Sequence, residues 1–306
     1  MEELYRRCRP RDFNEVVGQD SAIRKLEAAI KKNKVPHFIL FTGPTGCGKT
    51  TMARIMRRKL KCSRYDFIEG APRKVEDVRS IRRRMGQAPM RGDCRIWLVD
   101  ECHKLTPDAQ DEFLKMAGEA PSHVYFLFTT AEPQKLKPTL RNRDTEIVIK
   151  SLKDEDLADL IVSVCKVERV KIPSEVVAKI VDNSNGSARK AMVFLDSVMN
   201  LTGKREMLES IVTVTAETQA IAIARALFNP RTKWPAMAKI LRETKGEEAE
   251  QIRWMILSYA DKVLLGAGKL SGRAYIIIDA FSENFYNNKW AGLDAVCYEV
   301  IVGADE

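Results

Sequence analysis

The stretch Gly43-Pro44-Thr45-Gly46-Cys47-Gly48-Lys49-Thr50 decides the fold class. It follows the apolar run 38–41 and leads into the helix-forming residues 51–55. Its glycines, lysine and threonine occupy every fixed position of a phosphate-binding loop. In such a loop the backbone N–H groups surround phosphate oxygens, the lysine reaches the β- and γ-phosphates, and the threonine hydroxyl binds Mg²⁺. A helix that starts behind the loop adds a dipole that favours anions. The sequence therefore predicts a nucleoside triphosphate site.

The second half of such a site is a buried strand that ends in carboxylates. Residues 95–101, with the sequence Arg-Ile-Trp-Leu-Val-Asp-Glu, supply this strand. Four consecutive apolar residues suit a central parallel strand covered on both faces, and ligands bind at the carboxyl ends of such strands. We expect Asp100 to hold Mg²⁺ through water and Glu101 to polarise the water that attacks the nucleotide.

The rest of the chain indicates an α/β domain followed by helices. Short apolar strands at 38–41, 96–99 and 124–128 alternate with helical stretches, which predicts a parallel sheet with helices on both faces. Residues 154–167 and 174–199 have helical periodicity, and residues 183–187 break the second stretch so that a new helix starts near Ser187. We expect an α/β domain over 1–150 and helical segments over 151–204 and 205–306, which the family resemblance given below implies are an ATPase domain, a helical lid and an all-helical collar domain.

Composition excludes several other classes. Charged residues make up 30% of the chain, and no apolar run approaches the eighteen residues of a membrane span. The charged start is unlike a signal peptide. The seven cysteines form no Cys-x-x-Cys pair, so we expect free thiols, no zinc site and a cytoplasmic location.

Two clusters of basic residues stand out in a chain of net charge +9. The first comprises Arg54, Arg57, Arg58, Lys59 and Lys61, and the second comprises Arg79, Arg82, Arg83 and Arg84. The first fits a solvated helix face and a polyanion contact equally well. In the second, an apolar stripe at helical spacing leaves Arg79, Arg82 and Arg83 on neighbouring outward positions. We predict that these three arginines hold DNA phosphates without reading sequence, because no aromatic residues are interleaved with them.

Several separated motifs in the right order resemble those of AAA+ clamp-loader ATPase subunits. This family includes the bacterial tau/gamma subunit, the small subunits of replication factor C and the phage clamp-loader ATPase subunit. The segment 5–10 (Tyr-Arg-Arg-Cys-Arg-Pro), with Phe13 and residues 16–19 (Val-Val-Gly-Gln), is similar to the family's N-terminal segment, which folds over the adenine. Residues 74–79 and 88–92 are similar to the bacterial subunit in particular.

The resemblance implies roles for individual residues. The nucleotide would contact Tyr5, Arg9, Pro10, Val17, Gly46, Cys47, Gly48, Lys49, Thr50, Thr51 and Arg189. Thr50 and Asp100 would be the Mg²⁺ ligands, Thr130 would position water, and Arg189 would report the nucleotide state from the lid. Arg143 would be the finger that enters a neighbour's ATP site, with Arg141 as the alternative, since Asn142 and Asp144 replace the family's serine and cysteine.

The same resemblance implies an ATP-hydrolysing subunit of a DNA polymerase sliding-clamp loader. Such a subunit acts as several copies in a hetero-oligomeric ring, which we expect to be a pentamer, and it loads the clamp onto primer–template DNA. Two other interpretations stay open: a catalytically silent scaffold or DNA-binding subunit, and a AAA+ motor for branch migration or helicase loading. Only Cys62 and Cys94 lie between the loop and the acidic strand, so the zinc insertion of the bacterial subunit is not expected. The length and motifs together favour a bacteriophage or related replisome.

Overall fold

The computed structural model describes residues 3–143, 145–244, 249–266, 268 and 270–303. The chain forms two compact units, Met1–Met199 and Asn200–Glu306.

The first unit is built on five parallel strands in the order β2-β3-β4-β1-β5. They are β1 (Phe38–Thr42), β2 (Phe67–Gly70), β3 (Arg95–Val99), β4 (Val124–Thr130) and β5 (Thr145–Val148). The predicted parallel sheet and its three apolar strands are confirmed. Strands β2 and β5 were not predicted because both are partly exposed edge strands that lack a continuous apolar run.

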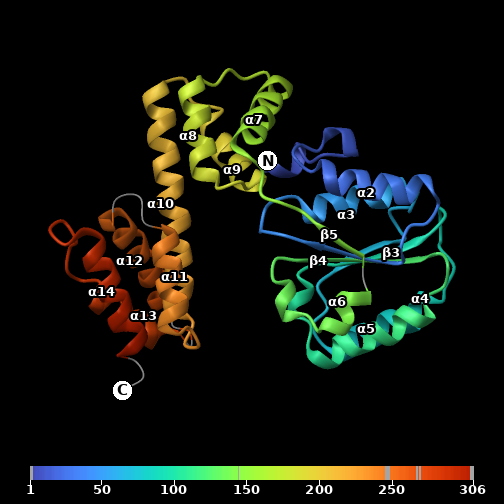
Figure 1. Ribbon diagram of the computed structural model, residues 1–306. Helices are drawn as coiled ribbons and strands as arrows, with labels where there is room; N and C mark the ends of the chain where they lie inside the picture. The colour runs from blue at the N-terminus through green and yellow to red at the C-terminus, as the bar shows by residue number, and fades with distance from the viewer. Residues whose placement is uncertain (1–2, 144, 245–248, 267, 269, 304–306) are drawn as a thin grey trace. The chain divides into compact units, whose positions relative to one another are not determined.

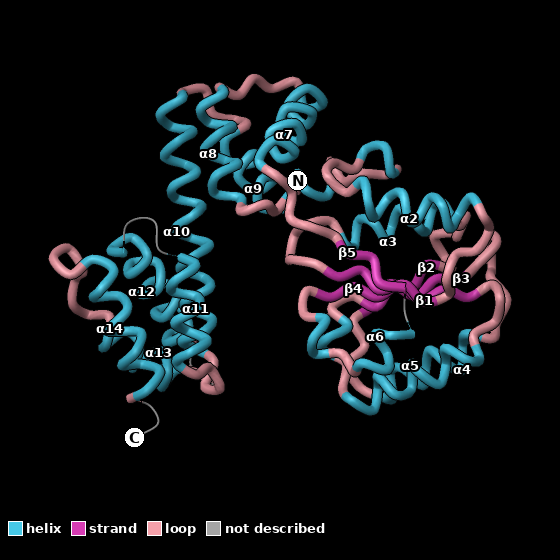
Figure 2. Tube along the Cα trace, in the orientation of Figure 1, coloured by secondary structure: helices cyan, strands magenta, loops and turns pink. Residues whose placement is uncertain are grey.

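Helices cover both faces of the sheet, as Figures 1 and 2 show. On one face lie α2 (Asp20–Lys31) and α3 (Lys49–Lys59), and on the other lie α4 (Val75–Met85), α5 (Pro107–Glu119) and α6 (Pro138–Arg143). Ile39 and Leu127 belong to the core beneath α3, whereas Phe126 and Phe128 make edge-to-face contacts with Phe113 of α5. Because the sheet is buried on both sides, its central strands are apolar at consecutive positions.

Three helices within the range of the predicted lid complete the first unit: α7 (Asp154–Glu168), α8 (Ser174–Ser184) and α9 (Ala188–Val198). The predicted break between the last two is confirmed. Asn185 and Gly186 have positive φ angles of 47° and 73°, and the Ser187 side chain caps α9 by accepting a hydrogen bond from the Lys190 N–H at 3.4 Å. The N-terminal helix α1 (Leu4–Arg7) packs on α9, and the 3₁₀ helix η1 (Phe13–Glu15) follows it.

The second unit is all-helical over its described residues. It contains α10 (Lys204–Phe228), α11 (Trp234–Thr244), α12 (Ala249–Leu265), α13 (Ser271–Ala280) and α14 (Lys289–Val302). By length and composition alone α10 could cross a membrane. However, its residues Ile223 and Leu227 are fully buried in a core with Ile256 and Leu293, which is the ordinary environment of a core helix in a folded domain.

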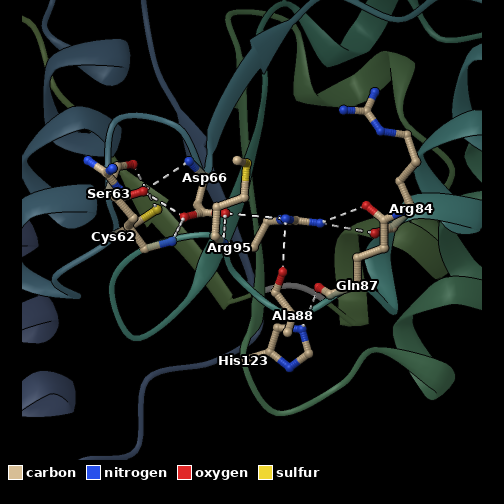
Figure 3. Close-up of polar contacts among 10 residues, drawn as sticks. Cys62, Ser63, Asp66, Arg84, Gln87, Ala88, Arg95 and His123 are labelled. Atoms are coloured by element: carbon tan, nitrogen blue, oxygen red, sulfur yellow. Dashed lines mark hydrogen bonds and ion pairs between the residues drawn. The ribbon is translucent and has the colours of Figure 1, made fainter.

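A buried polar network joins the amino end of β3 to the loop between α3 and β2 and to the carboxyl end of α4 with the loop that follows it (Figure 3). The Asp66 carboxylate accepts hydrogen bonds from the Ser63 hydroxyl at 2.6 Å and from the Arg95 guanidinium at 3.2 Å. Arg95 also donates to the carbonyl oxygens of Arg84 at 3.2 Å and Ala88 at 3.1 Å. Arg95 thereby adds a hydrogen bond at the carboxyl end of α4 and connects this helix to the sheet.

Candidate nucleotide-binding site

The phosphate-binding loop connects β1 to α3 through backbone conformations that favour glycine. Gly43, Gly46 and Gly48 have φ angles of 141°, 83° and 106°. A Cβ atom on Gly43 would lie 1.9 Å from the Ile149 carbonyl oxygen, so the loop cannot accept a side chain there. The loop therefore places its backbone N–H groups at the amino terminus of α3, where anions are favoured.

Lys49 is buried within this loop. Its ammonium group donates hydrogen bonds to the carbonyl oxygens of Gly43 and Pro44, both at 2.8 Å. Burial lowers the pKa of Lys49, and the nearby Cys47, Glu101 and Asp100 oppose this shift. A buried cation with only carbonyl partners gains free energy when a phosphate anion arrives, because charge-assisted hydrogen bonds are about twice as strong as neutral ones.

The two predicted Mg²⁺ ligands lie together. The Thr50 hydroxyl lies 3.5 Å from the Asp100 carboxylate, and the Thr129 hydroxyl donates a hydrogen bond to the same carboxylate oxygen. Hydroxyl and carboxylate oxygens are the hard donors that Mg²⁺ prefers, and this ion keeps several waters in nucleotide sites. The donor set therefore fits Mg²⁺.

Glu101 has an unusual backbone conformation for a residue with a side chain. Its φ angle is 53°, in the left-handed region that costs a non-glycine residue free energy and that is common at functional sites. Its side chain is 36% exposed, and one carboxylate oxygen lies 3.4 Å from Nε2 of His103. The same nitrogen of His103 lies 3.4 Å from the carboxylate of Glu132. Glu101 thus remains open to solvent on one side, as a residue that orients water requires.

Thr129 and Thr130 end β4 on opposite faces of the sheet, because successive side chains of a strand alternate. Thr129 lies on the α3 face and contacts Asp100, and it also accepts a 3.4 Å hydrogen bond from the Glu101 N–H. Thr130, the predicted water-positioning residue, contacts Nδ1 of His103 at 3.0 Å and accepts a hydrogen bond from the Glu132 N–H at 3.0 Å. Thr130 is fully buried, and its contact with Glu101 runs through His103. Its role in positioning water therefore stays a prediction, and Thr129 becomes a second candidate for that role.

A cavity of about 340 Å³ connects the loop, the acids, the N-terminal segment and the lid. All the residues predicted to contact the nucleotide line it: Tyr5, Arg9, Pro10, Val17, Gly46, Cys47, Gly48, Lys49, Thr50, Thr51 and Arg189. Asp100 and Glu101 line it as well. Cys8 and Gln19 of the N-terminal motif, for which the sequence predicted no individual contact, also line this space, and so does Met192, which the sequence did not single out. The volume lies at the lower end of the range for small-molecule sites.

Direct contacts join the lid to the loop and to the N-terminal segment. The Arg189 N–H donates to the Gly46 carbonyl oxygen at 3.2 Å, and the Arg189 guanidinium lies 5.3 Å from the centre of the Tyr5 ring. Gln19 makes two hydrogen bonds with the backbone of Lys150, at 2.8 and 3.1 Å, where the chain enters the lid. The position of Gln19 in the N-terminal motif was the sequence signal that could have revealed this contact. A change in the cavity would therefore reach the lid through Arg189 and Gln19.

Arg141 and the predicted DNA residues Arg79, Arg82 and Arg83 are not among the described residues that line this cavity. Arg143 ends α6, and its side chain falls outside the part of the chain that the structure describes. Arg141 forms an exposed ion pair with Glu146 at 3.4 Å. On α4, Arg79 and Arg83 are exposed.

Arg82 differs from its two neighbours because carboxylates already hold it. Its guanidinium contacts Glu112 at 2.9 Å and Glu119 at 2.6 Å, and these contacts raise its pKa. Its charge is neutralised within the protein. Of the three arginines predicted to hold DNA, Arg79 and Arg83 therefore remain available.

The fold is of the AAA+ P-loop type, and the site has the arrangement of a nucleotide-binding site. The solved structure of the RuvB Holliday junction branch migration motor of Thermotoga maritima has the same fold, with a TM-score of 0.59 and 19% identity over 77% of this chain and 85% of RuvB. Within the class, residues 18–71 and 66–153 match the family described as "DNA polymerase III, delta subunit".

Two relatives are subunits of the same bacterial polymerase. The gamma/tau subunit of DNA polymerase III from Mycobacterium tuberculosis is 32% identical over 222 residues, which cover 64% of this chain and 38% of the relative. The tau subunit from Bacillus subtilis is 25% identical and is covered over 62% of its length by 98% of this chain. The chain thus spans less than two thirds of these relatives. The resemblance seen in the motifs is confirmed: the chain is similar to subunits of bacterial DNA polymerase III, the gamma/tau subunits among them.

Proposed function

We propose that the chain is an ATP-hydrolysing subunit of a loader for a DNA polymerase sliding clamp. The observation that carries this proposal is the single cavity that joins the phosphate-binding loop, the acids of β3, the N-terminal segment and Arg189 of the lid. A nucleotide held there would contact all four parts at once. Binding and hydrolysis could then change the position of the lid, which is what coupling of ATP turnover to mechanical work requires.

Each residue has a chemical task in the proposed reaction. Lys49 would leave the Gly43 and Pro44 carbonyl oxygens to bind the β- and γ-phosphates. Thr50 and Asp100 would hold Mg²⁺, which supplies charge neutralisation on the phosphates when bound. Glu101 would orient the attacking water, and His103 would position the Glu101 carboxylate. Tyr5, Pro10 and Val17 would surround the base.

Assembly into a ring is the second part of the proposal. Arg143 would act on the ATP site of a neighbouring subunit, where a cation neutralises the charge that develops on the phosphates. The all-helical second unit would be the collar, and several of its large apolar side chains are exposed, including Trp254, Tyr275 and Tyr286. The relatives are named as subunits of DNA polymerase III, which favours a hetero-oligomeric loader in the cytoplasm. The number of subunits and a bacteriophage source stay predictions.

Two alternatives remain from the sequence. A silent scaffold subunit would have no need of Lys49, Thr50, Asp100 and Glu101, all of which line the cavity. A branch-migration motor has the same fold, but the RuvB likeness at 19% identity concerns the fold alone. The sequence match to gamma/tau subunits favours clamp loading over both.

The direct test is the ATPase activity of the purified chain, assembled with its partner subunits. We expect sliding clamp and primer–template DNA together to stimulate ATP hydrolysis, and Glu101→Gln to remove that stimulation. Stimulation by four-way junctions in place of clamp would overturn the proposal in favour of a branch-migration motor. No hydrolysis under any condition would favour the silent subunit.

The finger can be tested in the same assembled ring. Arg143→Ala should abolish hydrolysis while each chain still binds ATP, because binding relies on the chain's own loop. Arg141→Ala is the matched control and should retain most of the activity. A loss that occurs with Arg141→Ala and not with Arg143→Ala would transfer the role to Arg141.

The predicted DNA contacts of α4 can be tested by measuring DNA affinity at several salt concentrations. Alanine at Arg79 and Arg83 should weaken binding to all primer–template sequences about equally and reduce the salt dependence by about one unit of log slope per lost phosphate contact. Arg82→Ala should change the slope less, because Glu112 and Glu119 already neutralise Arg82. An unchanged slope in the double variant would make these arginines a solvated face.

A further inference from the structure

A second hollow, of about 280 Å³, lies between the N-terminal segment, α3 and β2. Its lining contains one carboxylate, that of Glu69, and six arginines: Arg6, Arg9, Arg11, Arg54, Arg57 and Arg58. Arg9 and Pro10 also line the nucleotide cavity, so the two spaces are neighbours. The proposed ATPase reaction uses none of the arginines of α3. The arginine site, as we name this hollow, therefore needs its own explanation.

The contacts of these arginines leave most of the positive charge unmatched. Arg54 forms a two-pronged ion pair with Glu69, with distances of 2.8 and 2.9 Å. Arg58 donates a hydrogen bond to the carbonyl oxygen of Arg11 at 2.9 Å, which does not neutralise its charge. Arg6 forms an exposed ion pair with Glu3 at 3.1 Å. With Arg6 and Arg54 each matched by a carboxylate, an excess of four positive charges remains around this small volume. Such an excess is unfavourable unless an anion enters.

Two buried donors point to the same conclusion. Nη1 of Arg9 and Nε of Arg57 are buried and have no hydrogen-bond partner among the described residues. Burial lowers the pKa of both side chains, and the positive charges of Arg54 beside Arg9 and of Arg58 beside Arg57 lower it further. Buried N–H groups without partners are rare in folded proteins and cost free energy. An anion would satisfy these donors.

The geometry favours phosphate over carboxylate. The Arg57 guanidinium lies 5.4 Å from the centre of the Phe67 ring, and this contact holds its planar fork in one orientation. Guanidinium forks match phosphate oxygens with paired hydrogen bonds. A chain of phosphates delivers several negative charges into a hollow of this size, whereas a peptide carries one charge on each bulky acidic side chain.

We propose that the arginine site binds an oligophosphate, with its charges opposite Arg9, Arg54 and Arg57. The source is either a free oligophosphate or the backbone of a single nucleic-acid strand, which present the same chemistry. This proposal does not depend on ATP hydrolysis or on clamp loading. It assigns to the first basic cluster, on α3, a polyanion contact where the sequence left a solvated face equally open.

The experiment is a calorimetric titration of tripolyphosphate into the full chain saturated with ADP, so that the phosphate-binding loop is filled. The test variant is Arg54→Gln/Arg57→Gln. The matched control, Arg24→Gln/Lys25→Gln, removes the same charge from exposed residues of α2. We expect one tripolyphosphate site in the wild type and the control, weakened about tenfold or more in the test variant. No site in the wild type, or equal affinities in all three proteins, would overturn the proposal.

Glu69→Gln gives a measurement with the opposite sign. Loss of this carboxylate frees Arg54 and removes the negative charge of the lining, so tripolyphosphate should bind more tightly than to the wild type. Unchanged or weaker binding would contradict the proposal even if the double variant failed to fold.

A single-stranded oligothymidine, titrated into the same proteins, distinguishes the two sources. If the test variant weakens binding of the oligonucleotide and lowers the slope of its salt dependence by about 1.4 units, which is about 0.7 for each lost phosphate contact on a single strand, the site holds a nucleic-acid backbone. If only tripolyphosphate responds, the site holds a free oligophosphate. Losses of the same size in the test variant and in the control would show a general charge effect and overturn both.

Discussion

Charged residues lie at both ends of β3, but their environments are opposite. At the amino end, Asp66 and Arg95 are 0% and 6% exposed, and the Asp66 carboxylate accepts hydrogen bonds from four donors (Figure 3). At the carboxyl end, Asp100 and Glu101 are partly exposed, and Glu101 has a strained backbone. The difference teaches that charges whose partners lie within the fold support structure, whereas charges left open at a cavity are available for chemistry.

Breaking the buried network of Asp66 and Arg95 at the amino end of β3, which we call the closed end, should have the largest effect. Asp66→Ala leaves the Arg95 guanidinium buried without its carboxylate, and loss of one partner of a buried pair costs about 3–5 kcal/mol of unfolding free energy. Urea denaturation measures this loss. Glu209→Ala, which removes the exposed ion pair with Arg205, is the control and should cost at most about 1 kcal/mol. If both variants lost the same stability, the closed end would have no special structural role.

Changing the carboxyl end of β3, where Asp100 and Glu101 line the cavity, should slow turnover and leave the free energy of unfolding nearly unchanged. Glu101→Gln keeps the volume of the side chain and removes the carboxylate that orients water, so ATP should still bind while hydrolysis slows on the order of a hundredfold. Steady-state ATPase and urea denaturation on the same preparation check both statements. Near-normal hydrolysis in the presence of clamp and DNA would exclude Glu101 as the activating residue.

Acid provides a graded version of the first test. Burial alone would raise the pKa of Asp66, but hydrogen bonds from Ser63, from the backbone N–H groups of Arg91 and Met90 and from Arg95 outweigh it and lower this pKa to about 2. A lowered pKa means that Asp66 stabilises the fold above about pH 4, near the ordinary aspartate value of 3.8. This stabilisation, on the order of 2 kcal/mol, disappears as the pH falls toward 2.

The comparison with Asp66→Asn isolates this single group from the other carboxylates. The difference in unfolding free energy between the wild type and the variant should shrink as the pH falls from about 4 toward 2. A difference that stays constant across that range would show that Asp66 does not retain its charge through the hydrogen bonds of the network.

The smallest expected effect separates the two threonines at the end of β4. Thr129→Val removes a hydrogen bond to Asp100, and a hydrogen bond to a charged group contributes about 1.5–3 kcal/mol, so turnover should fall about tenfold or more. Thr130→Val is the matched variant on the other face and should have the lesser effect, because it acts through His103. The reverse order in ATPase assays would restore Thr130 as the residue that positions water.

Much of the site could be predicted because its residues lie at fixed spacing. The loop 43–50 and the acids of β3 are contiguous motifs, and the N-terminal segment and Arg189 followed from the resemblance. The edge strands β2 and β5 have no apolar run, so periodicity did not reveal them. The ion pairs of Arg82 with Glu112 and Glu119 depend on how α4 packs against α5, which the sequence of α4 alone does not contain.

The most direct test of the account is a calorimetric titration of ATP with Mg²⁺ into the wild-type chain and into Lys49→Ala. The account predicts one ATP per wild-type chain and an affinity at least about tenfold lower in the variant, because the ATP phosphates lose the ammonium group that would bind them. The unfolding midpoint of the two proteins without nucleotide should be similar, which shows that the variant is folded. Equal ATP affinity in the wild type and in folded Lys49→Ala would contradict the assignment of the cavity as the nucleotide site.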